Sequence, residues 1–476
     1  MSNKGLYGSP TGRKEGSGGV FNYANLDKDL SLSVADMGKT ININTPNNYS
    51  VKLPDARQLA SVMMVVISNF SATQVINVKD NNGLVVKTVM PMQSVIFWAT
   101  SKATSGGAWI AKRVGGGDSV ANNLLINAAT QLSTTTSYRF SICQINANQA
   151  IAFYSLNSNY AVANVITLSG SGASSAILFG TLFTVSTTST MTNDCDSICP
   201  ISATQAVVIF TESGNQPATA VLTVSGTGSS ANISKGTTLL LSSVTVRNCE
   251  ICQIANMKVL VTYDEIVSGS GKVCALTISG TTLTAGTIVS VAAYGTEQQT
   301  LSQLSTDVAI ISYTKSTGEV TSVVATISGT NITLGTPVQI SATTTQFMAS
   351  AALSSNQLVI LVRNASFYPT IYLLTINGTA ITVGAVTVIE SNACTYPSIC
   401  AINNNQVIVA YSNLLNYLSA VILTQIGSSM LIGSISTISP SPNTVQEVSI
   451  CGMNSSQALT LCYGSGAPTV HALTAF

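Results

Sequence analysis

The sequence holds 476 residues with a formal net charge of +1, and only 8% of them are charged. Residues 1–117 hold 12 Lys/Arg and 6 Asp/Glu, whereas residues 118–476 hold 7 and 12. Nucleic-acid phosphates are bound by clustered Lys and Arg, so we expect no nucleic-acid binding by the second part. No apolar run approaches the roughly 18 residues of a membrane span, and no signal-peptide core follows Met1.

The first 114 residues predict an arm and a small domain. Residues 1–20 are rich in Gly, Ser, Lys and Arg without periodicity, which predicts an extended arm that orders against a partner. Residues 21–114 predict a small antiparallel β-sandwich or roll, because short β-type runs alternate with turn residues. These runs are Thr40–Asn44, Ser50–Leu53, Met63–Ser68, Gln74–Lys79, Leu84–Met90 and Ser94–Ala99. Gly115-Gly116-Gly117 then indicates a linker over residues 115–122.

A strand-rich repeat of about 50 residues fills residues 123–476. Each copy can be divided into four strands, and the fourth strand carries a glycine. These glycines are Gly180, Gly236, Gly286, Gly335, Gly384 and Gly433, at steps of 56, 50, 49, 49 and 49 residues. A fixed period of this length is typical of β-strands arranged radially around an axis.

The count of strands predicts how the array closes. Seven first strands are centred on Cys143, Cys199, Cys252, Leu304, Leu353, Cys400 and Cys451, but only six fourth strands follow them. Leu125–Ser133 matches the missing strand in pattern and lies upstream of the first repeat. We therefore predict a seven-bladed β-propeller closed by an N-terminal strand. An open solenoid is the alternative, and it would need capping ends.

The cysteines predict a structural role. A first-strand position that accepts Cys or Leu is a small buried apolar site, so we expect all ten cysteines to be free, reduced thiols of a protein made in a cytoplasm. The local pairs Cys195/Cys199, Cys249/Cys252 and Cys394/Cys400 differ in spacing and predict no metal site. A ring of thiols that binds a metal around the central channel stays open as an alternative.

No catalytic, cofactor-binding or metal-binding residue emerges from the sequence. His471 is the only histidine and falls in a predicted strand, where we expect a structural role. Asp194-Cys195-Asp196 and Asp264-Glu265 are local carboxylate pairs at predicted turns, and we interpret them as solvated turn residues; a catalytic or Ca²⁺-binding role is the alternative. Glycoside hydrolysis is disfavoured there, because it needs two carboxylates that face one cleft and adjacent residues on a strand point in opposite directions. We expect Arg139, Arg247 and Arg363, near blade starts or strand ends, to pair with the few acids. The chain is accordingly not expected to be an enzyme.

Residues Thr40–Ile110 resemble the small β domains near the start of many tailed-bacteriophage virion proteins. The segments that carry the resemblance are ININT…YSVKLPDA, VVISNFSATQVINVKDNNGLVVKTV and FWATS…GGAWI. A propeller in such a chain is similar to those of phage nozzle, tail and fibre proteins. The resemblance implies a virion structural component made in the host cytoplasm. The N-terminal unit would attach to other virion proteins, and the propeller would act as channel, spacer or receptor-facing head.

Low charge also leaves a long chain weakly protected against association, so we expect a homo-oligomer. The alternative function is a lectin, a propeller that binds carbohydrate or a host receptor. It would need Trp and Tyr beside carboxylates or amides on one face. Trp98 and Trp109 lie outside the propeller, whereas Tyr160, Tyr368, Tyr396 and Tyr417 fall in predicted inter-strand loops. A propeller hydrolase or lyase is disfavoured by the shortage of repeat-phased acids and of histidine.

Overall fold

The computed structural model divides into two compact units, Met1–Ala121 and Asn122–Phe476. It describes residues 13–16, 20–23, 28–37, 39–59, 64–71, 74–89, 93–101, 103–113, 124–126, 130–135, 137–156, 160–170, 176–188, 195–292, 296–342, 345–438, 445–455, 457–464 and 467–475. Apart from strands, this part of the chain holds short 3-10 helices at Val34–Asp36, Ala56–Gln58 and Gly228–Ser230. The all-β prediction is confirmed. None of the helices in the described ranges has the length and apolar character needed to cross a membrane.

The first unit consists of two sheets that share one core. One sheet has the order β1 (Arg13–Gly16), β2 (Val20–Tyr23), β4 (Thr40–Ile43), β6 (Met64–Asn69), β9 (Gln93–Ser101), β10 (Ala108–Arg113). The other has the order β3 (Leu30–Ser31), β5 (Tyr49–Lys52), β7 (Ile76–Lys79), β8 (Val85–Val89). Alternate residues of both sheets, such as Ile41, Ile43 and Val78, are fully buried in a common cluster, as period-2 patterning requires.

Two predictions for this unit need correction. The sheets are mixed rather than antiparallel, because β2–β4, β4–β6, β3–β5 and β5–β7 are parallel pairs. The chain alternates between the sheets, so successive strands of one sheet are joined by a crossover and run in the same direction. Within the predicted arm, Arg13–Gly16 forms a strand antiparallel to Val20–Tyr23. The predicted linker, residues 115–122, lies outside the described residues.

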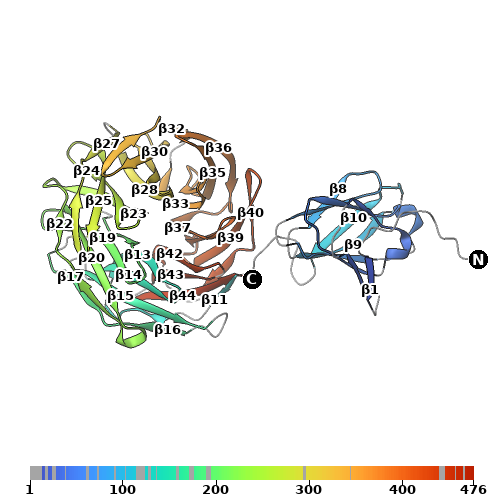
Figure 1. Ribbon diagram of the computed structural model, residues 1–476, viewed down its shortest axis with the longest axis horizontal. Helices are drawn as coiled ribbons and strands as arrows, with labels where there is room; N and C mark the ends of the chain where they lie inside the picture. The colour runs from blue at the N-terminus through green and yellow to red at the C-terminus, as the bar shows by residue number, and fades with distance from the viewer. Residues whose placement is uncertain are drawn as a thin grey trace, which may run out of the picture. The chain divides into compact units, whose positions relative to one another are not determined.

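The second unit contains, among its described residues, seven sheets of four or five strands with antiparallel pairing. Figure 1 shows them side by side around a common centre, which is consistent with a β-propeller. In chain order, the first three are β13 (Ser137–Asn146), β14 (Gln149–Leu156), β15 (Tyr160–Ser169), β16 (Ala176–Phe179), β17 (Phe183–Ser186); then β18 (Ser197–Pro200), β19 (Gln205–Glu212), β20 (Gln216–Ser225), β21 (Asn232–Lys235), β22 (Leu239–Leu240); then β23 (Val246–Ala255), β24 (Lys258–Glu265), β25 (Ser270–Ser279), β26 (Thr282–Ala285), β27 (Val289–Ala292).

The remaining four sheets follow the same plan. They are β28 (Thr296–Ser305), β29 (Val308–Lys315), β30 (Val320–Ser328), β31 (Asn331–Leu334), β32 (Val338–Ser341); β33 (Gln346–Ser354), β34 (Gln357–Arg363), β35 (Pro369–Asn377), β36 (Ala380–Val388); β37 (Cys394–Asn403), β38 (Gln406–Asn413), β39 (Leu418–Ile426), β40 (Ser429–Ile432), β41 (Ser436–Ile438); and β42 (Gln446–Asn454), β43 (Gln457–Gly464), β44 (Ala467–Ala475) with β11 (Leu124–Ile126), β12 (Thr130–Gln131). In most sheets the predicted fourth strand is therefore two short pieces, both paired with the third strand.

Segments from the start and the end of the second unit share one sheet. Leu124–Ile126 lies antiparallel to Leu473–Ala475, and Thr130–Gln131 lies antiparallel to Thr469–Val470. Of the predicted upstream strand, residues 127–129 lie outside the described part. The first and last sheets also pack together in one hydrophobic cluster. Their first strands are joined by a hydrogen bond from Gln144 Nε2 to the Met453 carbonyl oxygen.

Close approach between neighbouring sheets explains the repeated glycine. A Cβ added at Gly236 would lie 2.3 Å from the Thr281 carbonyl oxygen in the next sheet. The same addition at Gly180 would lie 2.5 Å from the Ala231 carbonyl oxygen. A side chain at Gly180 or Gly236 would push the next sheet away, so sheet packing requires glycine at these two positions.

The first-strand cysteine position is a small buried site, as predicted. Cys143, Cys199, Cys252, Cys400 and Cys451 are buried free thiols. In the two remaining copies, however, strand pairing places Ser302 and Ala351 at this position, opposite Ile310 and Val359. Leu304 and Leu353, which are also buried, lie two residues further on. Only small side chains therefore occupy the position itself.

Candidate functional site

A bulge near the start of the first strands defines the candidate site. The pairing register shifts at this point in six of the seven described first strands. Five bulged residues have the positive φ angles that non-glycine residues rarely adopt: Arg139 (56°), Asn248 (53°), Phe347 (50°), Tyr396 (51°) and Glu447 (54°). Bulges re-aim side chains, and strained backbone of this kind concentrates at functional sites.

All seven described sheets contribute to one open cavity of about 450 Å³. The lining follows the sheet order around the ring. One arc is charged and carries Glu447, Arg139, Asp196 and Glu250; the other arc carries Gln298, Phe347 and Tyr396. Few charges occur in the chain, so their concentration in one cavity marks it as the candidate functional site.

The charged arc holds three carboxyl groups beside one guanidinium. The Arg139 backbone N–H donates to the Glu447 carboxylate, and Arg139 Nε lies 3.9 Å from Glu447 Oε1. Burial raises the pKa of Asp196 well above its ordinary value; Arg139 opposes this shift, whereas Glu447 and Glu250 add to it. Burial also raises the pKa of Glu447, against the Arg139 contacts.

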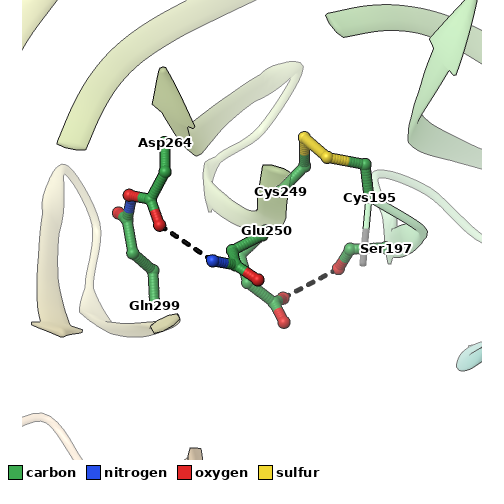
Figure 2. The surroundings of a disulfide bond; sticks show 7 residues. Cys195, Ser197, Cys249, Glu250, Asp264 and Gln299 are labelled. Carbon is green, nitrogen blue, oxygen red and sulfur yellow. Dashed lines mark hydrogen bonds between the residues drawn. A yellow bond between two sulfur atoms is a disulfide. The ribbon is translucent and has the colours of Figure 1, made fainter. Parts of the chain in front are cut away.

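Glu250 is the carboxyl group of this arc that titrates near neutral pH. Burial raises its pKa to about 7, although a hydrogen bond from Ser197 Oγ, at 2.9 Å, favours the ionised form. Figure 2 shows this bond, which links the first strand β23 to the neighbouring first strand β18. A group poised in this way changes charge over a narrow range around pH 7.

A buried carboxylate behind the wall fixes two amide side chains. Asp264 is fully buried and accepts hydrogen bonds from Asn248 Nδ2, at 2.9 Å, and from Gln299 Nε2. In Figure 2, Asp264 and Gln299 lie side by side. The interpretation of Asp264 as a solvated turn residue is therefore wrong, and so is that of Asp196, which lines the cavity. Glu265 does lie nearer the surface, 3.6 Å from Lys272 Nζ.

The aromatic arc is built from Phe347 and Tyr396. Their ring centroids lie 5.0 Å apart, with 58° between the ring planes. The guanidinium carbon of Arg363 lies 4.7 Å from the Phe347 centroid and 4.9 Å from that of Phe367. Arg363 thus stacks on aromatic rings in a cation–π arrangement instead of the predicted acid pair.

The other residues considered in the sequence take different places. Arg139 pairs with an acid as predicted, and Arg247 lies opposite Asp264 in the strand register. His471 is buried in β44, and neither it nor Tyr160, Tyr368 or Tyr417 lines the cavity. Asp194 lies outside the described residues. In the described ranges, no group of three or more His, Cys, Asp or Glu side chains is arranged to hold a metal ion.

The prediction that all ten cysteines are free is wrong for two of them. Cys195 and Cys249 form a disulfide at the edge of the cavity, which joins two neighbouring sheets (Figure 2). They meet because each occupies the start of a first strand, one repeat apart, and these starts converge around the axis. The sequence signal was the 54-residue separation, which is close to one repeat. Spacing within a single repeat could not reveal it.

Comparison with known proteins identifies no family for this chain. No protein-family model and no curated protein matches the chain. Among solved structures, AofleA from Arthrobotrys oligospora has a TM-score of 0.44 at 9% identity, covering 72% of this chain and 93% of its own. A mutant Aleuria aurantia lectin in complex with Fucα1-6GlcNAc has a TM-score of 0.41 at 13% identity, covering 65% and 97%. A Lactobacillus plantarum protein has 0.43 at 12% identity, covering 73% and 96%. At such TM-scores these likenesses carry no argument about this chain's ligand.

Proposed function

We propose that the chain is a carbohydrate-binding protein and that the cavity at the first-strand bulges is its sugar site. The observation that carries the proposal is the composition of this one cavity, where Phe347 and Tyr396 stand across from carboxylates and a guanidinium. Sugars present apolar C–H faces that pack on aromatic rings, and hydroxyls that bond to carboxylates and amides. The volume of about 450 Å³ is that of a small-ligand pocket and suits a short saccharide.

The same proposal includes a closed seven-bladed propeller. The seven sheets would be its blades, and β11 with β12 would be the closing strand supplied from upstream. Support comes from the shared hydrophobic cluster of the first and last sheets and from the Gln144–Met453 hydrogen bond between them. Closure matters for function, because the cavity wall takes residues from every sheet.

Binding without hydrolysis is expected at this site. Glycoside hydrolysis needs two carboxyl groups on opposite sides of the scissile bond. Here Asp196 and Glu250 lie on neighbouring sheets, and Glu447, further around the ring, is engaged by the Arg139 backbone and side chain. The only histidine, His471, is not part of the lining.

The test is glycan binding by the full chain and by matched aromatic variants. On a glycan array the native protein should bind a defined set of saccharides without releasing new reducing ends. Phe347→Ala and Tyr396→Ala should each weaken binding about tenfold, as the loss of a contact worth roughly 1.4 kcal/mol requires. Tyr417→Ala, outside the lining, should bind like the native chain. Absence of glycan binding, or equal loss in all three variants, would disprove the sugar site.

A structural role in a bacteriophage virion is our second candidate function. The observation that favours it is the separate first unit with its own two-sheet core, preceding the repeats, as an attachment module would. The resemblance of Thr40–Ile110 to phage virion β domains points the same way. Both functions are compatible, because a virion protein that faces a receptor also needs a ligand site.

A further inference from the structure

The cavity lining holds three carboxyl groups and one guanidinium. Asp196, Glu250 and Glu447 offer carboxylate oxygens, and the Arg139 guanidinium lies nearest to Glu447. Gln299 is only 4% exposed, and its Oε1 has no hydrogen-bond partner within the described structure. Its Nε2 donates to Asp264, so the amide is held in place with its oxygen enclosed by the protein.

A second buried acceptor lies beside it. Gln298 Oε1 also has no hydrogen-bond partner among the described groups, and Gln298 lines the cavity. An unpartnered buried acceptor makes its surroundings more negative, which favours a cationic group nearby.

Charge leads to the same conclusion. Three carboxyl groups face one arginine in a partly desolvated space, and Asp196 is destabilised in its ionised form by Glu447 and Glu250. A cation placed between them would relieve this repulsion, because opposite charges attract more strongly where water is excluded.

We propose that the sugar bound here carries a free, protonated amine, as in a 2-amino-2-deoxyhexose residue, with its ammonium group between Asp196 and Glu250. This inference rests on the proposed carbohydrate-binding function. An ammonium group has three donors and a positive charge, which complement the carboxyl groups of the wall. The sugar ring then lies towards Phe347 and Tyr396. Acetylation of the amine removes its positive charge, and a sugar acid carries a negative charge that the carboxyl groups repel, so neither should bind well.

The pH dependence of binding should be bell-shaped. The groups around the ammonium position are Asp196 before β18, Glu250 on β23, Glu447 on β42, Arg139 on β13 and Asp264 behind the wall on β24. On the opposite arc stand Tyr396 on β37 and Arg363 on β34, of which Arg363 stays charged. Ionisation of Glu250, whose pKa is about 7, strengthens binding as pH rises towards 8. Deprotonation of the ligand amine weakens binding at higher pH.

Titration calorimetry of the full chain with three trisaccharides tests the inference. The probes are a β-1,4-linked glucosamine trisaccharide, its fully N-acetylated form and the corresponding glucose trisaccharide. We expect the free-amine form to bind about tenfold or more tightly than either of the others. Equal or tighter binding of the acetylated or neutral form would overturn the amino-sugar inference and keep the sugar site. If no probe binds and the glycan array also gives no hit, both the amino-sugar inference and the proposed sugar site are disproved.

Isosteric variants show whether the carboxylates are responsible. Glu250→Gln and Asp196→Asn should each reduce affinity for the free-amine trisaccharide about tenfold and flatten the rising side of the pH profile. Glu265→Gln removes an acid from the same sheet outside the cavity lining and should change affinity less than about twofold. Unchanged melting temperature and circular dichroism spectrum would establish that each variant is folded. Native affinity in both cavity variants would contradict the inference.

Discussion

Cys249 and Cys252 lie three residues apart on β23 and have different chemistry. Cys249 is bonded to Cys195, whereas Cys252 is a free thiol in the core. Burial raises the pKa of Cys252 above its ordinary value, as it does for Cys143 and Cys199. The thiolate is the reactive form, so these buried thiols should be inert in the folded protein.

Thiol labelling should therefore distinguish the two kinds of cysteine. The native chain should take almost no maleimide, and the unreduced, denatured chain should take eight labels by mass spectrometry, one for each free cysteine. Reduction of the denatured chain before labelling should raise the number to ten, the total in the sequence. Unreduced Cys195→Ser should take nine, because it frees Cys249. Ten labels on unreduced native-sequence protein would contradict the disulfide.

At the same scale, the sequence predicted buried positions better than the cavity wall. The small first-strand site could be found because Cys143, Cys252, Cys400 and Cys451 share a local motif. The cavity residues share none, since Arg139, Asn248, Tyr396 and Glu447 differ in every property. Their common feature is position: each stands four residues before one of those cysteines. Each repeat contributes a different residue type to the cavity, so residue type alone could not reveal the cavity.

Among the elements, the strands were easier to predict than their partners. Period-2 patterning located β4 to β9 of the first unit to within a residue or two. It could not show that the chain alternates between two sheets, because a strand has the same pattern in parallel and antiparallel pairs when one face is buried. In the second unit the repeat supplied the missing information, since equivalent strands must pair equivalently.

The burial of Leu124 on the short strand β11 leads to a prediction about stability. Leu124 is 7% exposed and packs in the cluster of the last two sheets, whereas Leu240 on β22 is 53% exposed. Leu124→Ala should therefore destabilise the second unit by about 2 kcal/mol and lower Tm by several degrees. Leu240→Ala should leave Tm nearly unchanged.

Deleting residues 118–135 is the stronger form of this experiment. It removes β11 and β12 and leaves β44 as an unpaired edge, so we expect aggregation or a much larger fall in Tm. If the deleted protein and Leu124→Ala both melt like the native chain, β11 and β12 do not close the ring.

At the scale of the whole molecule, sparse charge and exposed apolar turns favour self-association. Val267, Phe367, Leu414 and Leu415 are at least half exposed, and each lies in a turn between the second and third strands of its sheet. Adjacent strands are antiparallel, so these turns lie at the same end of the sheets as the cavity. Apolar patches of this kind mark interaction surfaces.

We therefore predict a homo-oligomer held mainly by apolar contacts. The excess of basic residues before residue 118 and of acidic residues after it can add attraction, but salt screens such pairs beyond about 8 Å at physiological ionic strength. Assembly should thus survive roughly half-molar salt. A sulfate salt should even strengthen it, because sulfate favours the burial of apolar surface.

Light scattering on the full chain should give a mass above the 49.2 kDa of one copy. Replacing Leu414 and Leu415 by Asn should shift the mass towards one copy, while Leu240→Asn, exposed on a different edge, should not. A full chain that stays monomeric at micromolar concentration, and is absent from purified particles of its source, would exclude both the oligomer and the virion role and leave a free-standing sugar binder.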